Sequence, residues 1–203
     1  AMFATPGLFF GRIANFINGE LWGRPLPQNL QSQPPAWSVK YPTEITDVWV
    51  LQPEKFTEKL SLLEPLQTSV AGGTSFHQTI VHEMYAGNAV VIETVQPLLT
   101  AWYPSQLFQA VAEGPLLFFA FLLLWCKPRK PGTIACSFLL LYGVARVATE
   151  AFRQPDEGVA IILGLSRGQV LSVGMIALGL VLLVMITRLK SKTYGGFQAA
   201  LRS

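Results

Sequence analysis

Charged side chains are scarce in this sequence. Only 13% of its 203 residues are Asp, Glu, Lys or Arg, whereas a soluble domain normally carries about 25%. Hydrophobic residues make up 51% of the chain and gather in its C-terminal half, in runs long enough to cross a bilayer. The net charge is only +3. The basic residues stand at the ends of apolar runs, and this arrangement indicates membrane topology and not nucleic-acid binding. We therefore expect a membrane protein without a nucleic-acid partner.

Cysteine and histidine are equally rare, with two of each. Cys126 and Cys136 both lie in or beside hydrophobic segments, so we expect free thiols and no disulfide framework. His77 and His82 are five residues apart, a spacing that does not place two ligands on one helical face, and no cysteine accompanies them. We expect ordinary surface histidines, no metal and no cofactor.

The first ten residues have no basic leader and no cleavage-site pattern, so they are not a signal peptide. Their apolar run is also too short to cross a bilayer, which takes about 20 residues. It is typical of the end of a transmembrane helix that begins earlier. We expect the chain to be an N-terminally truncated fragment.

No apolar run of transmembrane length occurs between Arg24 and Ala101, where Pro, Gln, Thr, Ser and Glu predominate. This stretch is predicted to be a small irregular head outside the membrane. Residues 48–51 and 89–92 resemble short strands, and residues 58–66 a helical turn or two.

Three apolar runs in the C-terminal half predict transmembrane helices, at about 103–126, 133–152 and 169–189. The short, basic, helix-breaking connector 127–132 should reverse the chain between the first two. The fold class is therefore an all-α polytopic membrane protein, with three full transmembrane helices, the end of a preceding one and a partly β head. The expected divisions are 1–24 (helix end and polar motif), 25–102 (head), 103–192 (three-helix region) and 193–203 (tail).

The stretch from Gly11 to Arg24 is rich in polar groups for a membrane edge. Arg12 presents a planar fork that matches phosphate, while Asn15 and Asn18 can donate amide hydrogens. Glu20 can orient an arginine from behind. In the alternative, Arg12 only reaches the lipid headgroups and the asparagines cap a helix end. We favour an anion site, because ionisable groups at a membrane edge are functional candidates by default.

A second polar group lies in the predicted middle span. Tyr142, Arg146 and Glu150 are spaced by four and so share one helix face. Arg and Glu each cost roughly 2.5–3.5 kcal/mol at the centre of a bilayer and less near its edge. Either they form an ion pair that locks two helices, or Arg146 holds a lipid phosphate while Glu150 positions its guanidinium and Tyr142 donates a hydrogen bond.

The first polar stretch resembles the signature of the prolipoprotein diacylglyceryl transferases, a bacterial inner-membrane family. That signature runs Gly-Arg-x-(Gly or Ala)-Asn-apolar-apolar-Asn-x-Glu-x-x-Gly, and every fixed position is met. The matching residues are Gly11, Arg12, Ala14, Asn15, Asn18, Glu20 and Gly23.

Further matches to the family follow in the C-terminal half. In relatives the Tyr, Arg and Glu of the middle span precede a Phe-Arg-x-Pro-Asp turn, which is residues 152–156 here. Residues 103–109 resemble the start of a family helix that is followed by Glu-Gly, although Phe108 replaces the usual tyrosine and Gln109 the usual glutamate. The other matching positions are Ser166, Gly168, Gln169 and Ser172. Only the stretch between Arg24 and Tyr103 matches poorly.

The resemblance implies an enzyme of the bacterial inner membrane. It would transfer the diacylglyceryl group of phosphatidylglycerol to the lipobox cysteine thiol of a prolipoprotein signal peptide, releasing glycerol phosphate. Its partners would be phosphatidylglycerol, the prolipoprotein and the bilayer. A departing phosphate ester needs fixed cations, which Arg12 and Arg146 can supply, and Glu150 can position the guanidinium of Arg146; we therefore expect these three residues to be catalytic. The implied substrate-binding residues are Arg12, Asn15, Asn18, Glu20, Gly23, Tyr142, Arg146 and Arg153.

The general base is not identified, because the family's histidine stands in a His-Gly-Gly context that neither His77 nor His82 shares. The resemblance implies that the His-Gly-Gly segment, and the helices that would cover the polar face of the middle span, lie upstream of this chain, so we expect the fragment to be inactive alone. The alternatives are a phospholipid-binding or transport protein without catalysis, and an assembly subunit whose arginines only pair helices. Neither explains why both motifs occur in family order.

The charge distribution predicts the orientation in the membrane. The basic residues that flank one face are Lys127, Arg129, Lys130, Arg188, Lys190 and Lys192. By the positive-inside rule this face and the tail are cytoplasmic, and the head is periplasmic. An impermeant thiol reagent applied to intact spheroplasts should label Thr57→Cys and miss Lys130→Cys, each compared with the unsubstituted chain. The reverse labelling would overturn the orientation.

Overall fold

The computed structural model describes residues 2–68, 75–153 and 166–197. The chain forms two compact units, one of residues 1–24 with 104–203 and the other of residues 25–103.

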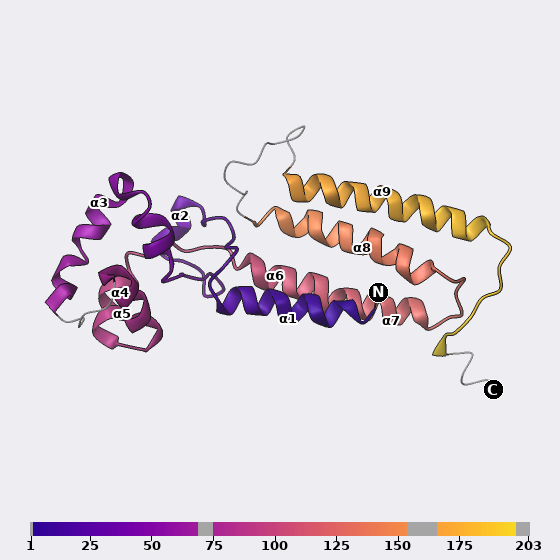
Figure 1. Cartoon of the computed structure of the whole chain (residues 1–203), viewed down its shortest axis with the longest axis horizontal. Coiled ribbons are helices and arrows are strands. Elements are labelled where there is room, and N and C mark those ends of the chain that lie inside the picture. The colour runs from indigo at the N-terminus through magenta and orange to yellow at the C-terminus, as the bar shows by residue number, and fades with distance from the viewer. Residues whose placement is uncertain (1, 69–74, 154–165, 198–203) are drawn as a thin grey trace. The chain divides into compact units, whose positions relative to one another are not determined.

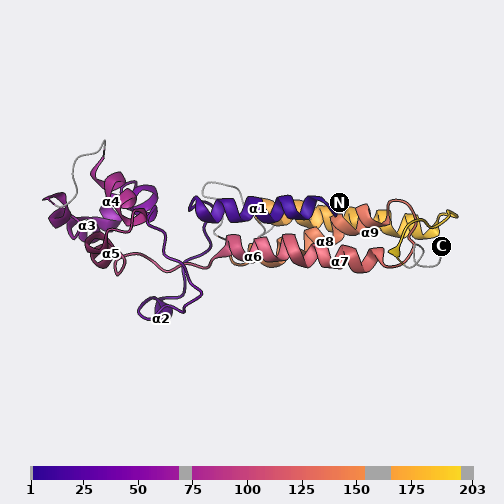
Figure 2. The ribbon, with the colours of Figure 1, turned by 90° about the horizontal axis from the view of Figure 1, so that it is seen from below.

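The first unit is a bundle of helices. Its elements are α1 (Ala4–Ile17), α6 (Ser105–Val111), the π-helical turn η3 (Ala112–Leu116), α7 (Leu117–Trp125), α8 (Thr133–Glu150) and α9 (Arg167–Arg188). Figures 1 and 2 both show α8 beside α9 and α1 beside α6. The helix that was expected to end near residue 10 continues to Ile17, so Arg12 and Asn15 lie on it.

Among the described residues of this unit, three helices are long and apolar enough to cross a membrane. They span Ser105–Trp125, Thr133–Glu150 and Arg167–Arg188, with 21, 18 and 22 residues. The three predicted transmembrane runs are thereby confirmed as helices of suitable length and composition. Cys126 and Cys136 are free thiols, as expected.

The first of these spans is interrupted at Pro115, inside the π-helical turn. Proline lacks an N–H and clashes with the preceding turn, so an α-helix must loosen around it. The neighbouring residue, Gly114, is tightly packed, because an added Cβ there would lie 2.7 Å from the Cβ of Phe9. The missing side chain thus allows α1 to approach the turn closely.

Helices α8 and α9 pack together through small residues. A Cβ at Gly143 would lie 2.9 Å from the carbonyl oxygen of Ser172, and one at Gly179 would lie 2.8 Å from the backbone nitrogen of Leu140. Small residues at these crossings let two backbones approach, which is how helices associate where apolar burial gives little driving force.

The second unit is helical, so the expectation of strands was wrong. Its elements are α2 (Gln28–Gln31), the π-helix η1 (Ile45–Trp49), α3 (Pro53–Ser61), the 3-10 helix η2 (Glu64–Thr68), α4 (Phe76–Tyr85) and α5 (Ala89–Val95). Residues 48–51 run from η1 into a turn, and residues 89–92 begin α5. Short apolar runs do not distinguish strand from helix. Here the pairs that reach the core are spaced by four, as in Val91 and Val95.

A buried carboxylate organises the second unit. Glu44 is 1% exposed and accepts hydrogen bonds from Trp49 Nε1 at 2.9 Å, Thr100 N at 2.9 Å, Thr100 Oγ1 at 2.7 Å and Trp102 Nε1 at 3.2 Å. Its two oxygens can accept all four of these donors. The carboxylate therefore ties η1 to residues 100–102 across the unit.

Replacing this carboxylate by an amide should destabilise the second unit. In Glu44→Gln the NH2 group would face donors, so at least one buried hydrogen bond would be lost at a cost of about 1–3 kcal/mol. Thermal unfolding of the whole protein, followed by tryptophan fluorescence, should show a lower transition temperature. Glu58→Gln, at an exposed position of α3, is the matched control. Equal transition temperatures for the two variants would contradict this role.

Candidate functional site

The centre of the candidate site is Glu113, a carboxylate whose side chain is 0% exposed. Its Oε2 accepts a hydrogen bond from Arg12 Nε at 3.2 Å, and its Oε1 accepts one from Arg146 Nη1 at 3.3 Å. Arg12 comes from α1, Glu113 from the π-helical turn and Arg146 from α8. Three segments that are distant in the sequence therefore meet at one buried carboxylate.

Glu150 extends this group. Its Oε2 lies 3.6 Å from Arg146 Nη2, one helical turn away. We call Arg12, Glu113, Arg146 and Glu150 the charge cluster. The two arginine side chains are 17% and 12% exposed, and each has five N–H donors. Both can thus hold Glu113 and keep donors for a further anion.

The other carboxylate oxygen of Glu150 ties α8 to α9. Glu150 Oε1 accepts a hydrogen bond from Ser166 Oγ at 2.9 Å. Ser166 is the N-cap of α9 and forms a capping box with Gln169. A Cβ at Gly168 would lie 3.2 Å from Glu150 Oε1, so glycine allows this close approach. The family-like positions at the start of α9 therefore support Glu150.

Tyr142 lies one turn before Arg146 on α8, within electrostatic range of Arg12, Glu113 and Arg146. Its ring stacks on that of Phe138, with centroids 5.4 Å apart. The predicted grouping of Tyr142, Arg146 and Glu150 on one face of α8 is therefore seen, and Arg12 joins it through Glu113.

The remaining signature residues lie at the end of α1 and in the turn that follows. Asn15 is half-buried, whereas Asn18 and Glu20 are exposed. The main chain makes the contacts here: Asn15 O accepts from Glu20 N at 2.9 Å, and Glu20 O accepts from Gln106 Nε2 at 2.6 Å. Gly19 turns the chain with a φ of 66°, a conformation that glycine adopts readily. The structure thus brings Arg12, but not the side chains of Asn18 and Glu20, into the charge cluster.

Gly23 and Arg153 come together in a separate contact. They form an antiparallel bridge, flanked by hydrogen bonds from Arg24 N to Phe152 O at 2.9 Å and from Arg24 Nε to Arg153 O at 3.0 Å. The end of the first motif thus lies against the turn after α8. Residues 154–156 of the Phe-Arg-x-Pro-Asp turn lie outside the described residues.

Sequence reasoning missed Glu113 as a member of the site. The signal was present, since an acidic residue within an apolar run is a functional candidate. Gln109, one turn earlier, is 2% exposed, and its Nε2 has no hydrogen-bond partner within the described ranges.

The two histidines lie on α4 of the other unit. Burial lowers the pKa of His77 below its ordinary value, which favours the neutral imidazole. Within residues 2–68, 75–153 and 166–197, no group of three His, Cys, Asp or Glu side chains could hold a metal ion.

Comparisons with known proteins place this chain in a family. The family model described as Prolipoprotein diacylglyceryl transferase matches residues 1–185. A phosphatidylglycerol–prolipoprotein diacylglyceryl transferase of Bdellovibrio bacteriovorus is 42% identical over 95% of this chain and 58% of its own length. Proteins of the same name from Burkholderia ambifaria and Rhodospirillum rubrum are each 34% identical, over 88% and 94% of this chain and 50% and 49% of their own lengths.

The chain thus spans about half the length of the curated relatives that it matches. Because the family model covers nearly all of the chain, including the charge cluster and the Gly23–Arg153 contact, the chain belongs to the prolipoprotein diacylglyceryl transferase family.

Proposed function

We propose that this chain supplies the phosphate-recognition part of a phosphatidylglycerol–prolipoprotein diacylglyceryl transferase. The observation that carries the proposal is the pairing of Arg12 and Arg146 with one buried carboxylate, Glu113. Two arginines from separate motifs are thereby held at one place in an apolar bundle. The relatives are named for phosphatidylglycerol, a lipid that carries a single phosphate.

The transfer reaction requires a leaving phosphate to be stabilised and a thiol proton to be removed. The sulfur of the prolipoprotein's lipobox cysteine attacks the glycerol carbon of the lipid, a C–S bond forms, and the C–O bond to phosphate breaks. The electron pair of that bond leaves with glycerol phosphate. The thiol proton passes to a base, because the thiolate is the nucleophile and a free thiol has a pKa of about 8.5.

The negative charge on the departing phosphate must be stabilised as the C–O bond breaks. Oriented cations in a water-poor site do this strongly, because they need no reorganisation when the charge develops. In the proposed site Arg12 and Arg146 contact the phosphate with the N–H donors that Glu113 leaves free. Glu150 holds the guanidinium of Arg146 by its ion pair across one helical turn, and Tyr142 donates from the same face of α8.

The other signature residues are proposed to form the rim of the lipid site. Asn15, Asn18 and Glu20 offer polar groups at the end of α1, while Gly23 and Arg153 join that end to the turn after α8. We further propose that the chain is a multi-pass protein of the inner membrane, with the second unit on the periplasmic side. The basic connector and the basic end of α9 support this orientation.

Arg146→Lys should lower the rate of transfer although it keeps the charge. Lysine is a point charge and cannot contact Glu113, Glu150 and a phosphate with one planar group, and the loss of one such oriented donor costs about 100-fold or more in kcat. The assay supplies radiolabelled phosphatidylglycerol and a lipobox peptide to the full-length protein. Arg188→Lys, at the exposed end of α9, is the control. Near-normal transfer by a well-inserted Arg146→Lys enzyme would show that charge alone suffices.

Glu113→Gln should also lower kcat, because the arginines would lose the anion that orients them. If Glu113 acts through Arg146, the two substitutions affect one interaction, so the double variant should be little worse than the poorer single variant. The same transfer assay measures this, with Glu93→Gln at an exposed position of α5 as the control. Fully additive losses would show that Glu113 does not act through Arg146.

A further inference from the structure

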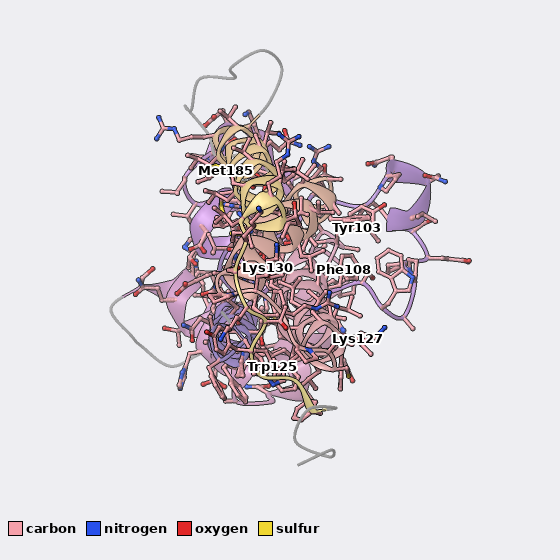
Figure 3. All side chains as sticks on the ribbon, turned by 90° about the vertical axis from the view of Figure 1, so that its right-hand side faces the viewer. Tyr103, Phe108, Trp125, Lys127, Lys130 and Met185 are labelled. Carbon is pink, nitrogen blue, oxygen red and sulfur yellow. The ribbon has the colours of Figure 1, made fainter. Side chains whose placement is uncertain are left out.

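The opposite end of the bundle from the charge cluster holds a pocket of about 450 Å3. Its lining residues come from the end of α7, the connector, the first turn of α8 and the tail; they are Trp125, Arg129, Lys130, Pro131, Gly132, Ile134, Ala135 and Tyr194. Figure 3 views this end, where Trp125, Lys127 and Lys130 are labelled. Its volume lies in the usual range for ligand sites.

The tail is held against the connector by specific contacts. Arg129 and Tyr194 form an antiparallel bridge, with N to O distances of 3.1 and 2.9 Å. The two glycines that follow both have a positive φ, and a Cβ on them would lie 2.6 Å from the Trp125 ring and 2.7 Å from Pro128 N, respectively. Only glycine fits both positions without rearrangement. The backbone at Tyr194 is therefore held in place against the connector, so Tyr194 forms a defined wall of the pocket.

The charge at this end is entirely positive. No Asp or Glu occurs in residues 114–149 or in residues 158–203. Lys130 Nζ donates to Thr187 O at 2.8 Å and to Leu189 O at 2.6 Å, which caps α9 while the ammonium keeps its charge. Arg129 Nε donates to Leu124 O at 3.0 Å, so four of its five N–H donors are available to a ligand. The positive end of the α8 dipole lies at the same pocket.

We propose that this pocket binds the phosphate of an anionic phospholipid, with Arg129 as its principal ligand. A lipid fits better than a free anion, because the pocket lies at the ends of three helices of membrane-spanning length. Trp125 and Tyr194 are the aromatic types that gather at the membrane interface. Ile134 and Ala135 give an apolar wall for the first acyl carbons. Basic pockets between transmembrane helices bind anionic headgroups in this way.

This site is separate from the proposed donor site. Ala135 and Arg146 lie at opposite ends of α8, about 16 Å apart along the helix at about 1.5 Å per residue. The bound lipid would hold the connector, α8 and the tail together, and it would not take part in the transfer reaction. Its test therefore needs no activity measurement.

The test is photo-crosslinking in the full-length protein, placed in phosphatidylcholine nanodiscs with a small fraction of phosphatidic acid that carries a diazirine near its headgroup. Mass spectrometry of the peptides should find adducts within residues 125–135 and at Tyr194. Excess unlabelled phosphatidic acid should remove them, and excess phosphatidylcholine should not. Adducts that never map to these residues would overturn the proposal, as would their loss in millimolar inorganic phosphate, which would indicate a free-anion site.

Two variants and their matched controls separate the pocket from a general surface charge. Arg129→Gln should reduce the adducts about tenfold, as expected for the loss of a charged hydrogen bond, whereas Lys192→Gln, which removes the same charge outside the pocket, should change them less than about twofold. Ala135→Phe should also reduce them by filling the pocket with no charge change. Val184→Phe, at an exposed position of α9, is its control. Equal losses in a variant and its control would overturn the proposal.

Discussion

The first unit depends on the pairing of Glu113 with two arginines. A carboxylate that is 0% exposed is costly in apolar surroundings unless cations and hydrogen bonds compensate it. Arg12 and Arg146 provide both. Loss of one partner from a buried pair typically costs about 3–5 kcal/mol, because the other charge is left uncompensated. The position of α1 against the π-helical turn and of that turn against α8 is therefore coupled to this one carboxylate.

The two units use a buried carboxylate in different ways. Glu44 accepts four hydrogen bonds from two tryptophan rings and one threonine. Each of these donor groups has one hydrogen, which its bond to Glu44 uses. Glu113 is instead held by arginines, whose guanidinium groups keep free donors after they bind it. The first arrangement stabilises a core. The second leaves guanidinium donors that are oriented by Glu113, and the proposed phosphate contact in the first unit uses these donors.

The two ends of α8 have different chemistry. Near its C-terminus, Arg146 and Glu150 are balanced by Glu113 and Arg12, so that end combines both signs of charge within the bundle. At its N-terminus, Arg129 and Lys130 have no acidic residue near them in the sequence. The ionised groups of α8 and its connector therefore lie toward the two ends of that helix. The proposed donor site thus combines both signs of charge, whereas the proposed headgroup pocket has basic residues alone among its charged lining residues.

The amino-acid sequence by itself determined the membrane class, the three spans, the family signature and the sharing of one helix face by Tyr142, Arg146 and Glu150. These features are local, because they depend on apolar run length or on spacings of a few residues. Only the tertiary structure decided that Arg12 and Arg146 share Glu113, from which they are separated by 101 and 33 residues, and that the head is helical. Both outcomes depend on long-range packing. A sequence pattern shows which residues are costly to bury alone, and only the folded chain shows which partners compensate them.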